Sequence, residues 1–208
     1  MPFGHQPGQP ATNAGRKFAP EPLTPDEVAA VIGQCSLRSA SGIRNRAMLT
    51  LLYYSGLRIS ELLAVRPPDV NFARHSIRLL DTKAGEAQTR GFHSRADDAV
   101  HRWADKRREL GIKGGPLFCT LGGGPVYPAY VRNLLKRLAE EAGIEKRVHP
   151  HGLRHTFAVE LDAGKTPITV ISKLLGHSNV PTTARYLDHL TNSQAVSALQ
   201  GVDMPSLD

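Results

Sequence analysis

The chain has 208 residues, of which 40% are hydrophobic and 22% are charged. This length suits one domain, or one large domain with appended segments, and the hydrophobic content is enough for a substantial core. No segment approaches the roughly 18–20 consecutive apolar residues of a membrane span, and the N-terminus has no apolar signal-peptide core. Cys35 and Cys119 form no CxxC pair, which disfavours structural zinc and a disulfide framework. We therefore expect a cytoplasmic protein with no membrane association.

The chain is basic, with 26 lysines and arginines, 19 aspartates and glutamates, a formal net charge of +7 and a pI near 9.7. A basic surface favours a polyanionic partner, because the binding of phosphates by lysine and arginine releases counterions. Charge alone does not establish this partner, since many basic proteins bind no nucleic acid.

The first residues predict a flexible arm. Residues 1–22 hold five prolines and three glycines, a composition that cannot bury a core. The folded part is expected to begin at Thr24, which can cap a helix whose first turn contains Pro25 and whose capping box is completed by Glu27. The arm is therefore expected to cover residues 1–23.

Apolar periodicity and breaker residues divide the rest of the chain into short elements. Further helices are predicted at residues 43–54, 61–65, 96–110, 128–142, 152–162 and 166–176, with another opened by Pro181. Two short strands are predicted at 76–80 and 89–93, joined by a hairpin loop over 81–88. The prediction is a mostly helical α+β domain with a small antiparallel sheet on one side.

Two arginines are candidates for binding a phosphate. Arg58 follows a glycine that is predicted to end a helix, and Arg154 lies in the first turn of another predicted helix. A guanidinium group is planar, stays charged and offers paired donors, so two of them can hold both non-bridging oxygens of a phosphodiester. The alternative is that each arginine forms a surface salt bridge, and Glu61, three residues after Arg58, is an obvious partner.

Histidines accompany these arginines. His151 lies three residues before Arg154, so the two share one face of the predicted helix. His177 lies just beyond the end of the next predicted helix. A single histidine is more often a cap or a buried structural group than a catalyst. His149, His151 and His155 could suggest a metal site, but no carboxylate or thiol cluster accompanies them, so we expect no metal.

Tyr186 is a candidate nucleophile. A phenol titrates at about pH 10, so it attacks poorly at neutral pH unless nearby cations and an imidazole base activate it. The alternative is a core aromatic side chain on an amphipathic helix that also carries Leu187 and Leu190.

Taken in order, these motifs resemble the catalytic domain of the tyrosine recombinase, or phage integrase, family and of its Xer-like members. The resemblance covers roughly residues 24–189. The motifs are Gly56-Leu57-Arg58-Ile59-Ser60-Glu61, a hairpin lysine, His151-Gly152-Leu153-Arg154, Leu175-Gly176-His177 and a final tyrosine. The intervals of 23 residues from Arg154 to His177 and of 9 residues from His177 to Tyr186 fit the family.

The resemblance implies the active-site residues. They are Arg58, Lys83, His151, Arg154, His177 and Tyr186. The arginines would bind the phosphoryl oxygens, and the lysine would protonate the leaving 5′-oxygen. The first histidine would assist proton transfer from the tyrosine, and the second would hydrogen-bond the phosphate or orient its neighbours. The hairpin of the family usually reads Gly-Lys-Gly-x-x-x-Arg, whereas Asp81 and Thr82 precede Lys83 here.

The resemblance also implies the reaction and the partners. The expected protein is a site-specific DNA recombinase that cleaves and rejoins double-stranded DNA through a 3′-phosphotyrosine intermediate, without a metal, cofactor or ATP. It would be monomeric without DNA and a homotetramer on paired sites, in the cytoplasm and on the nucleoid. Two alternatives stay open: a type IB topoisomerase-like nicking-closing enzyme, and a DNA-binding regulator derived from a recombinase.

The expected domains are an arm over 1–23, a catalytic domain over 24–190 and a tail helix over 191–208. In the family the corresponding tail docks into a neighbouring protomer; the alternative is that it packs on its own domain. Family members also commonly carry a helical module before the catalytic domain, and only 23 residues precede Thr24 here. Either the sequence is a truncated piece of a longer protein, or it resembles the short recombinases that invert fimbrial promoter switches.

Overall fold

The computed structural model describes residues 21–80 and 87–176. Within these ranges the α-helices are α1 (Pro25–Gly33), α2 (Ala40–Ser55), α3 (Ile59–Ala64), α4 (Asp97–Glu109), α5 (Pro128–Glu141), α6 (Pro150–Ala163) and α7 (Ile168–Leu175). The sheet consists of β1 (Val70–Asn71), β2 (Ser76–Leu80) and β3 (Ala87–Gly91), flanked by the 3-10 turns η1 (Pro67–Asp69) and η2 (Ser94–Ala96). The predicted mostly helical α+β fold with a small antiparallel sheet is confirmed. No helix in this part of the chain has both the length and the apolar character of a membrane span.

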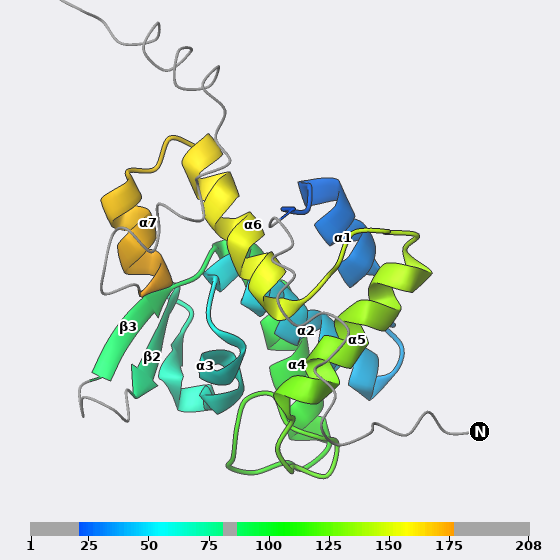
Figure 1. Cartoon of the computed structure of the whole chain (residues 1–208). Coiled ribbons are helices and arrows are strands. Elements are labelled where there is room, and N and C mark those ends of the chain that lie inside the picture. The colour runs from blue at the N-terminus through cyan, green and yellow to red at the C-terminus, as the bar shows by residue number, and fades with distance from the viewer. Residues whose placement is uncertain (1–20, 81–86, 177–208) are drawn as a thin grey trace, which may run out of the picture.

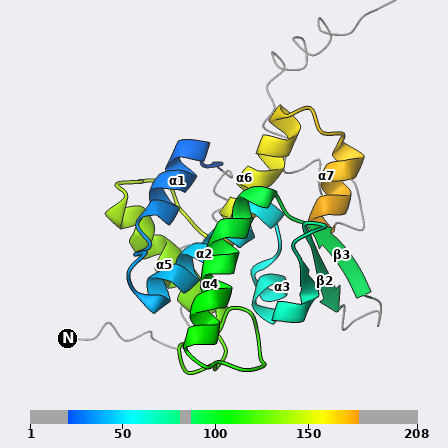
Figure 2. The ribbon, with the colours of Figure 1, turned by 180° about the vertical axis from the view of Figure 1, so that it is seen from behind.

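Helix α2 forms the centre of the core, where it packs against α4 and α6. Its fully buried residues include Ala47, Met48, Leu49, Leu51 and Leu52. Helices α1 and α5 lie on one side of the molecule, and α7 and the sheet lie on the other (Figure 1). Seen from behind, α4 crosses the middle of the molecule (Figure 2). A helix buried nearly all round needs apolar residues on every face, as α2 has.

Local capping chemistry sets where the first helices begin. The Thr24 hydroxyl accepts a hydrogen bond from the Glu27 backbone N–H at 3.2 Å, and Glu27 Oε2 accepts one from the Thr24 N–H at 2.7 Å. This is the capping box expected from the sequence. Helix α2 starts earlier than predicted, at Ala40, because the Ser39 hydroxyl accepts a hydrogen bond from the Gly42 N–H at 3.1 Å.

The sheet differs from the prediction in its details. Strands β2 and β3 pair antiparallel, with Ser76 opposite Gly91 and Leu80 opposite Ala87. The prediction of the second strand at 89–93 was wrong at both ends. It ran too far because the His93 N–H donates to the Tyr54 carbonyl on α2 rather than to a strand. Strand β1 was not predicted, since two residues are too few to show a period.

Several predicted segments lie wholly or mostly outside the described residues. They are the arm at 1–23, the hairpin loop, the helix opened by Pro181 and the tail at 191–208. The division into an arm at 1–23, a catalytic domain at 24–190 and a tail at 191–208 stays a prediction.

Gly56 ends α2 and turns the chain toward α3. Its φ of 59° lies in the left-handed region, which glycine adopts without the penalty that a Cβ atom brings. A Cβ atom at this position would lie 2.4 Å from Cδ1 of Phe157 on α6. The turn therefore packs so closely against α6 that only glycine, which has no side chain, fits at this position.

We expect Gly56→Ala to lower the free energy of unfolding by more than the roughly 1–2 kcal/mol that the left-handed conformation costs a residue with a Cβ atom. The excess arises because Phe157 must also move. Chemical denaturation measures the difference from the parent protein. Gly143→Ala is the matched control, because Gly143 has a φ of 69° and nothing within 4 Å of the Cβ position. Equal losses in the two variants would contradict the role of the Phe157 contact.

Candidate active site

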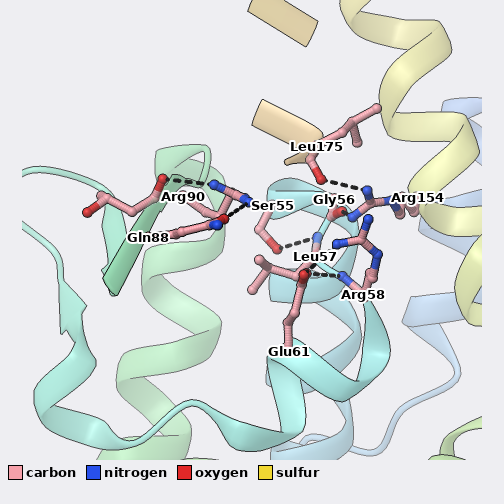
Figure 3. A network of polar contacts seen from close by, with 10 residues as sticks. Ser55, Gly56, Leu57, Arg58, Glu61, Gln88, Arg90, Arg154 and Leu175 are labelled. Atoms are coloured by element: carbon pink, nitrogen blue, oxygen red, sulfur yellow. Dashed lines mark hydrogen bonds and ion pairs between the residues drawn. The ribbon is translucent and has the colours of Figure 1, made fainter. Parts of the chain in front are cut away.

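Arg154 of α6 joins the carboxyl ends of two other helices. Its side chain is buried, with an exposed fraction of 2%. Nη1 donates to the Gly56 carbonyl at 2.6 Å, and Nη2 donates to the Leu175 carbonyl at 2.6 Å (Figure 3). The last carbonyls of a helix lack intrahelical partners and carry partial negative charge. These two carbonyls therefore offset the cost of burying the positive charge of Arg154, and the guanidinium group in turn holds the ends of α2 and α7 together.

Arg58 lies two residues beyond Gly56, as the N-cap of α3. Its Nη1 donates to Glu61 Oε1 at 2.7 Å, and its backbone N–H donates to Glu61 Oε2 at 2.7 Å. The salt bridge considered from the sequence thus exists, and it fixes the direction of the guanidinium group (Figure 3). The side chain remains 48% exposed. An arginine has several N–H donors, so this ion pair is compatible with binding an anion.

His151 lies in the first turn of α6, one turn before Arg154. The pKa of His151 is lowered, first by the loss of solvent on the part of the ring that the protein covers and then by the positive charges of Arg154, His149 and Arg58. The His149 and His151 rings are 6.4 Å apart. Arg154 bonds the Gly56 carbonyl, two residues from Arg58, and His151 lies one turn before Arg154, so the three residues come from neighbouring parts of the backbone. The lowered pKa favours the neutral imidazole, which accepts a proton.

The three histidines considered as metal ligands differ in their surroundings. His151 is exposed, whereas His155 is buried, with an exposed fraction of 3%. Over residues 21–80 and 87–176, no group of three or more histidine, cysteine, aspartate or glutamate side chains is arranged to hold a metal ion.

The other three predicted site residues, Lys83, His177 and Tyr186, lie outside the described residues. Gly176 is the last residue that the structure describes, and it ends α7 in the left-handed conformation with a φ of 66°. This is the helix end that the sequence predicts, and His177 follows it directly in the chain. Of the six predicted site residues, the structure therefore describes Arg58, His151 and Arg154.

Sequence analysis did not single out one buried residue next to this site, Arg90 of β3. Its exposed fraction is 9%, and its guanidinium group lies against Gly176. Counted from Lys83, the arginine of the usual hairpin pattern falls on Gln88 rather than on Arg90, so the motif spacing gave no signal for Arg90.

The phage integrase family matches residues 21–193, which is most of the chain. The chain belongs to this family. A tyrosine recombinase from Thermosipho africanus is 32% identical to it over 186 residues, which are 89% of this chain and 62% of the relative. The tyrosine recombinase XerD of Corynebacterium glutamicum is 34% identical over 180 residues, which are 84% of this chain and 59% of the relative. This chain thus spans less than two thirds of the length of these curated relatives.

Solved structures of family members share the fold. The crystal structure of XerA recombinase matches with a TM-score of 0.77 at 26% identity, over 92% of this chain and 69% of that one. A post-cleavage complex of XerH site-specific recombinase with its difH substrate matches with a TM-score of 0.74 at 21% identity, over 88% of this chain and 54% of that one. The tyrosine recombinase catalytic domain fold expected from the motifs is therefore confirmed.

Proposed function

We propose that this chain is the catalytic part of a site-specific DNA recombinase, which cleaves and rejoins double-stranded DNA through a 3′-phosphotyrosine intermediate. The observation that carries the proposal is the grouping of Arg58 and Arg154 beside His151, whose pKa is lowered. Two guanidinium groups can bind the non-bridging oxygens of one phosphodiester, and a neutral imidazole can take a proton from the attacking group. Membership of the integrase family and the net charge of +7 favour DNA as the anion.

In the proposed first step, the phenol oxygen of Tyr186 attacks phosphorus while the bond from phosphorus to the 5′-oxygen breaks. His151 takes the phenol proton, and Lys83 gives a proton to the leaving 5′-oxygen. The products are a 3′-phosphotyrosine ester and a free 5′-hydroxyl. Arg58 and Arg154 stabilise the negative charge that grows on the non-bridging oxygens in the transition state.

In the proposed second step, a 5′-hydroxyl from a partner duplex attacks the phosphotyrosine and gives its proton to Lys83. His151 returns its proton to the Tyr186 oxygen, which leaves as a phenol. The ester conserves the energy of the cleaved bond, so the cycle consumes no ATP. Arg58 and Arg154 supply the positive charge that metal ions supply in many other phosphoryl-transfer enzymes. His177 completes the proposed site by hydrogen-bonding the phosphate or orienting its neighbours.

The proposal includes the assembly and the domains. Four copies would pair two recombination sites, with residues 24–190 as the catalytic domain, 1–23 as an arm and 191–208 as a tail that docks on the next protomer. Free protein would be monomeric, in the cytoplasm, and would join the nucleoid when bound to DNA. One solved relative of the same fold is described as a lambda integrase dimer bound to a core site, which favours assembly on DNA.

A nicked suicide substrate tests the reaction. Duplexes selected by the protein from a random pool are nicked next to the scissile phosphate, so that the short 5′-hydroxyl fragment diffuses away after cleavage. We expect a covalent protein–DNA complex on a denaturing gel, with the DNA attached to the peptide that contains Tyr186. Absence of a covalent complex on DNA that the protein binds would favour the regulator. Supercoil relaxation without strand exchange between paired sites would favour the topoisomerase-like enzyme.

The lowered pKa of His151 predicts how cleavage depends on pH. Because the folded protein holds this pKa below the ordinary value of 6.5, the imidazole stays neutral as the pH falls through 6.5 and becomes charged only below it. We expect the second-order rate constant of covalent attachment, measured at limiting DNA so that it reports the free protein, to fall only below that pH, and we expect His151→Gln to be slower with this fall removed. DNA binding at each pH is the control. A fall centred above pH 6.5 would contradict this role for His151.

Lys83 is expected to act as the general acid. Lys83→Ala should slow cleavage of the normal substrate by about 10²–10⁴, the range that general acid catalysis contributes. A substrate with sulfur in place of the bridging 5′-oxygen should largely restore the rate, because a thiolate leaves without a proton. Single-turnover rates on the two substrates provide the measurement, and an equally slow reaction on the sulfur substrate would assign the acid to another residue.

A further inference from the structure

The carboxyl end of α7 rests against Arg90, a second buried arginine. Arg90 lies opposite Ile77 in the pairing of β3 with β2, and its exposed fraction is 9%. A Cβ atom built onto Gly176 would lie 1.9 Å from Arg90 Nη2 and 2.4 Å from Arg90 Cζ. The guanidinium group therefore lies directly against the backbone of the residue that ends α7. A second contact joins the same elements, because a Cβ atom on Gly91 would lie 3.5 Å from Cδ2 of Leu174.

The hydrogen bonds of Arg90 fix its side chain on the sheet. Nη2 donates to Gln88 Oε1 at 2.5 Å, and Nη1 donates to the Thr89 carbonyl at 3.4 Å (Figure 3). The buried Nε has no hydrogen-bond partner among the residues that the structure describes. A positive group at a helix carboxyl end is stabilised by the partial charge of that end. Its contact with α7 is thus part of what keeps Arg90 inside the protein.

This contact is one residue from Arg154. Nη2 of Arg154 donates to the Leu175 carbonyl at 2.6 Å, and Leu175 precedes Gly176 in the chain. The place of that carbonyl depends on the left-handed turn at Gly176, and therefore on the group that packs against the turn. A continuous series of contacts leads from Arg90 through Gly176 and the Leu175 carbonyl to Arg154.

We propose that Arg90 is a positioning residue for Arg154, which it holds in place by fixing the carboxyl end of α7 without touching DNA. This inference rests on the proposed cleavage reaction. Without the Arg90 guanidinium, the end of α7 can shift, and the Leu175 carbonyl then no longer aligns Arg154 with the phosphate oxygens. A misplacement of about 1 Å in an active site can slow a reaction by about 10²-fold.

The first test compares Arg90→Ala with the parent protein. We expect DNA affinity within a few-fold of the parent and a single-turnover cleavage rate that is lower by about 10–10²-fold. The decisive readout is a substrate with a methylphosphonate at the scissile position, where the non-bridging oxygens carry less charge to be neutralised. If Arg90 acts through Arg154, the loss of cleavage rate caused by Arg90→Ala must be smaller on this substrate than on the normal one. The loss caused by Arg154→Ala must become smaller in the same way. An equal deficit on both substrates, or none on either, would overturn the proposal.

A matched control is Arg107→Ala in α4. Arg107 is also a buried arginine, with an exposed fraction of 8%, and it donates to the carbonyls of Ile112 and Gly114 rather than to α7. Its loss should lower stability without changing the ratio of the rates on the two substrates. The same ratio change in this control would show that general loosening of the fold explains the Arg90 result.

The reciprocal variant places the change on the helix. Gly176→Ala pushes a methyl group into the Arg90 guanidinium, so it should slow cleavage, and adding Arg90→Ala should restore part of the rate. The strain of the left-handed turn is present in both backgrounds and cancels from this double-mutant comparison. Strictly additive effects would mean that the Arg90–Gly176 contact does not influence the reaction.

Hydrogen exchange separates this inference from the proposed function. In Arg90→Ala, the amides near the carboxyl end of α7 should exchange faster while those of α4 stay unchanged, whether or not the protein cleaves DNA. Unchanged exchange in α7 would overturn the positioning role. Failure of the parent protein to form any covalent complex would instead overturn the proposed function.

Discussion

Tyr186→Phe is expected to abolish covalent attachment to DNA and to leave duplex binding within a few-fold of the parent. The substitution removes only the oxygen that would form the phosphotyrosine ester, and this oxygen contributes little to affinity. The measurement is trapping on the nicked suicide substrate, together with the dissociation constant for the intact duplex. A phenol with a pKa of about 10 needs activation, which the proposed reaction assigns to the cations of Arg58 and Arg154 and to the His151 base.

Tyr127→Phe is the control for this experiment. Tyr127 is the N-cap of α5, is 66% exposed and has no part in the proposed chemistry. Its variant should be trapped as fully as the parent. Complete trapping of Tyr186→Phe would exclude Tyr186 as the nucleophile, and loss of trapping in both variants would indicate an indirect effect on the substrate complex.

The helix ends could largely be predicted from the sequence because capping is local chemistry. Thr24 and Glu27 are close in the chain and form their capping box, and Gly56 ends α2 in the left-handed conformation, as predicted. The register of β3 could not be predicted in the same way. It depends on pairing with β2, in which Arg90 lies opposite Ile77, and no local pattern in the sequence specifies that partner.

The candidate site shows the same division between local and long-range causes. Motif spacing proposed Arg58, His151 and Arg154 as site residues, and the salt bridge to Glu61 followed from its position one helical turn after Arg58. The burial of Arg154 was not predicted. Its guanidinium binds carbonyls that are 98 and 21 residues away in the sequence, and backbone carbonyls leave no signature in a residue pattern.

Arg154→Lys is expected to lower both the stability of the protein and the cleavage rate. A single ammonium group cannot reproduce the planar fork that binds the Gly56 and Leu175 carbonyls at 2.6 Å each. Leaving a buried carbonyl without its donor costs about 1–3 kcal/mol. In the proposed reaction, loss of one preorganised donor to the phosphoryl oxygens slows cleavage by about 10²–10³. Chemical denaturation and single-turnover cleavage measure the two effects.

Arg58→Lys separates these two effects, because Arg58 is proposed to bind the same phosphate but makes no bond between helix ends. Its ion pair with Glu61 is 48% exposed on the arginine side, and exposed pairs contribute only about 0–1 kcal/mol. We therefore expect Arg58→Lys to lose cleavage rate with little loss of stability, whereas Arg154→Lys loses both. Equal stabilities of the two variants would show that the carbonyl bonds of Arg154 do not hold α2 and α7 together. Arg154 would then act on the phosphate alone, and the contact of Arg90 with α7 could not reach the reaction through it.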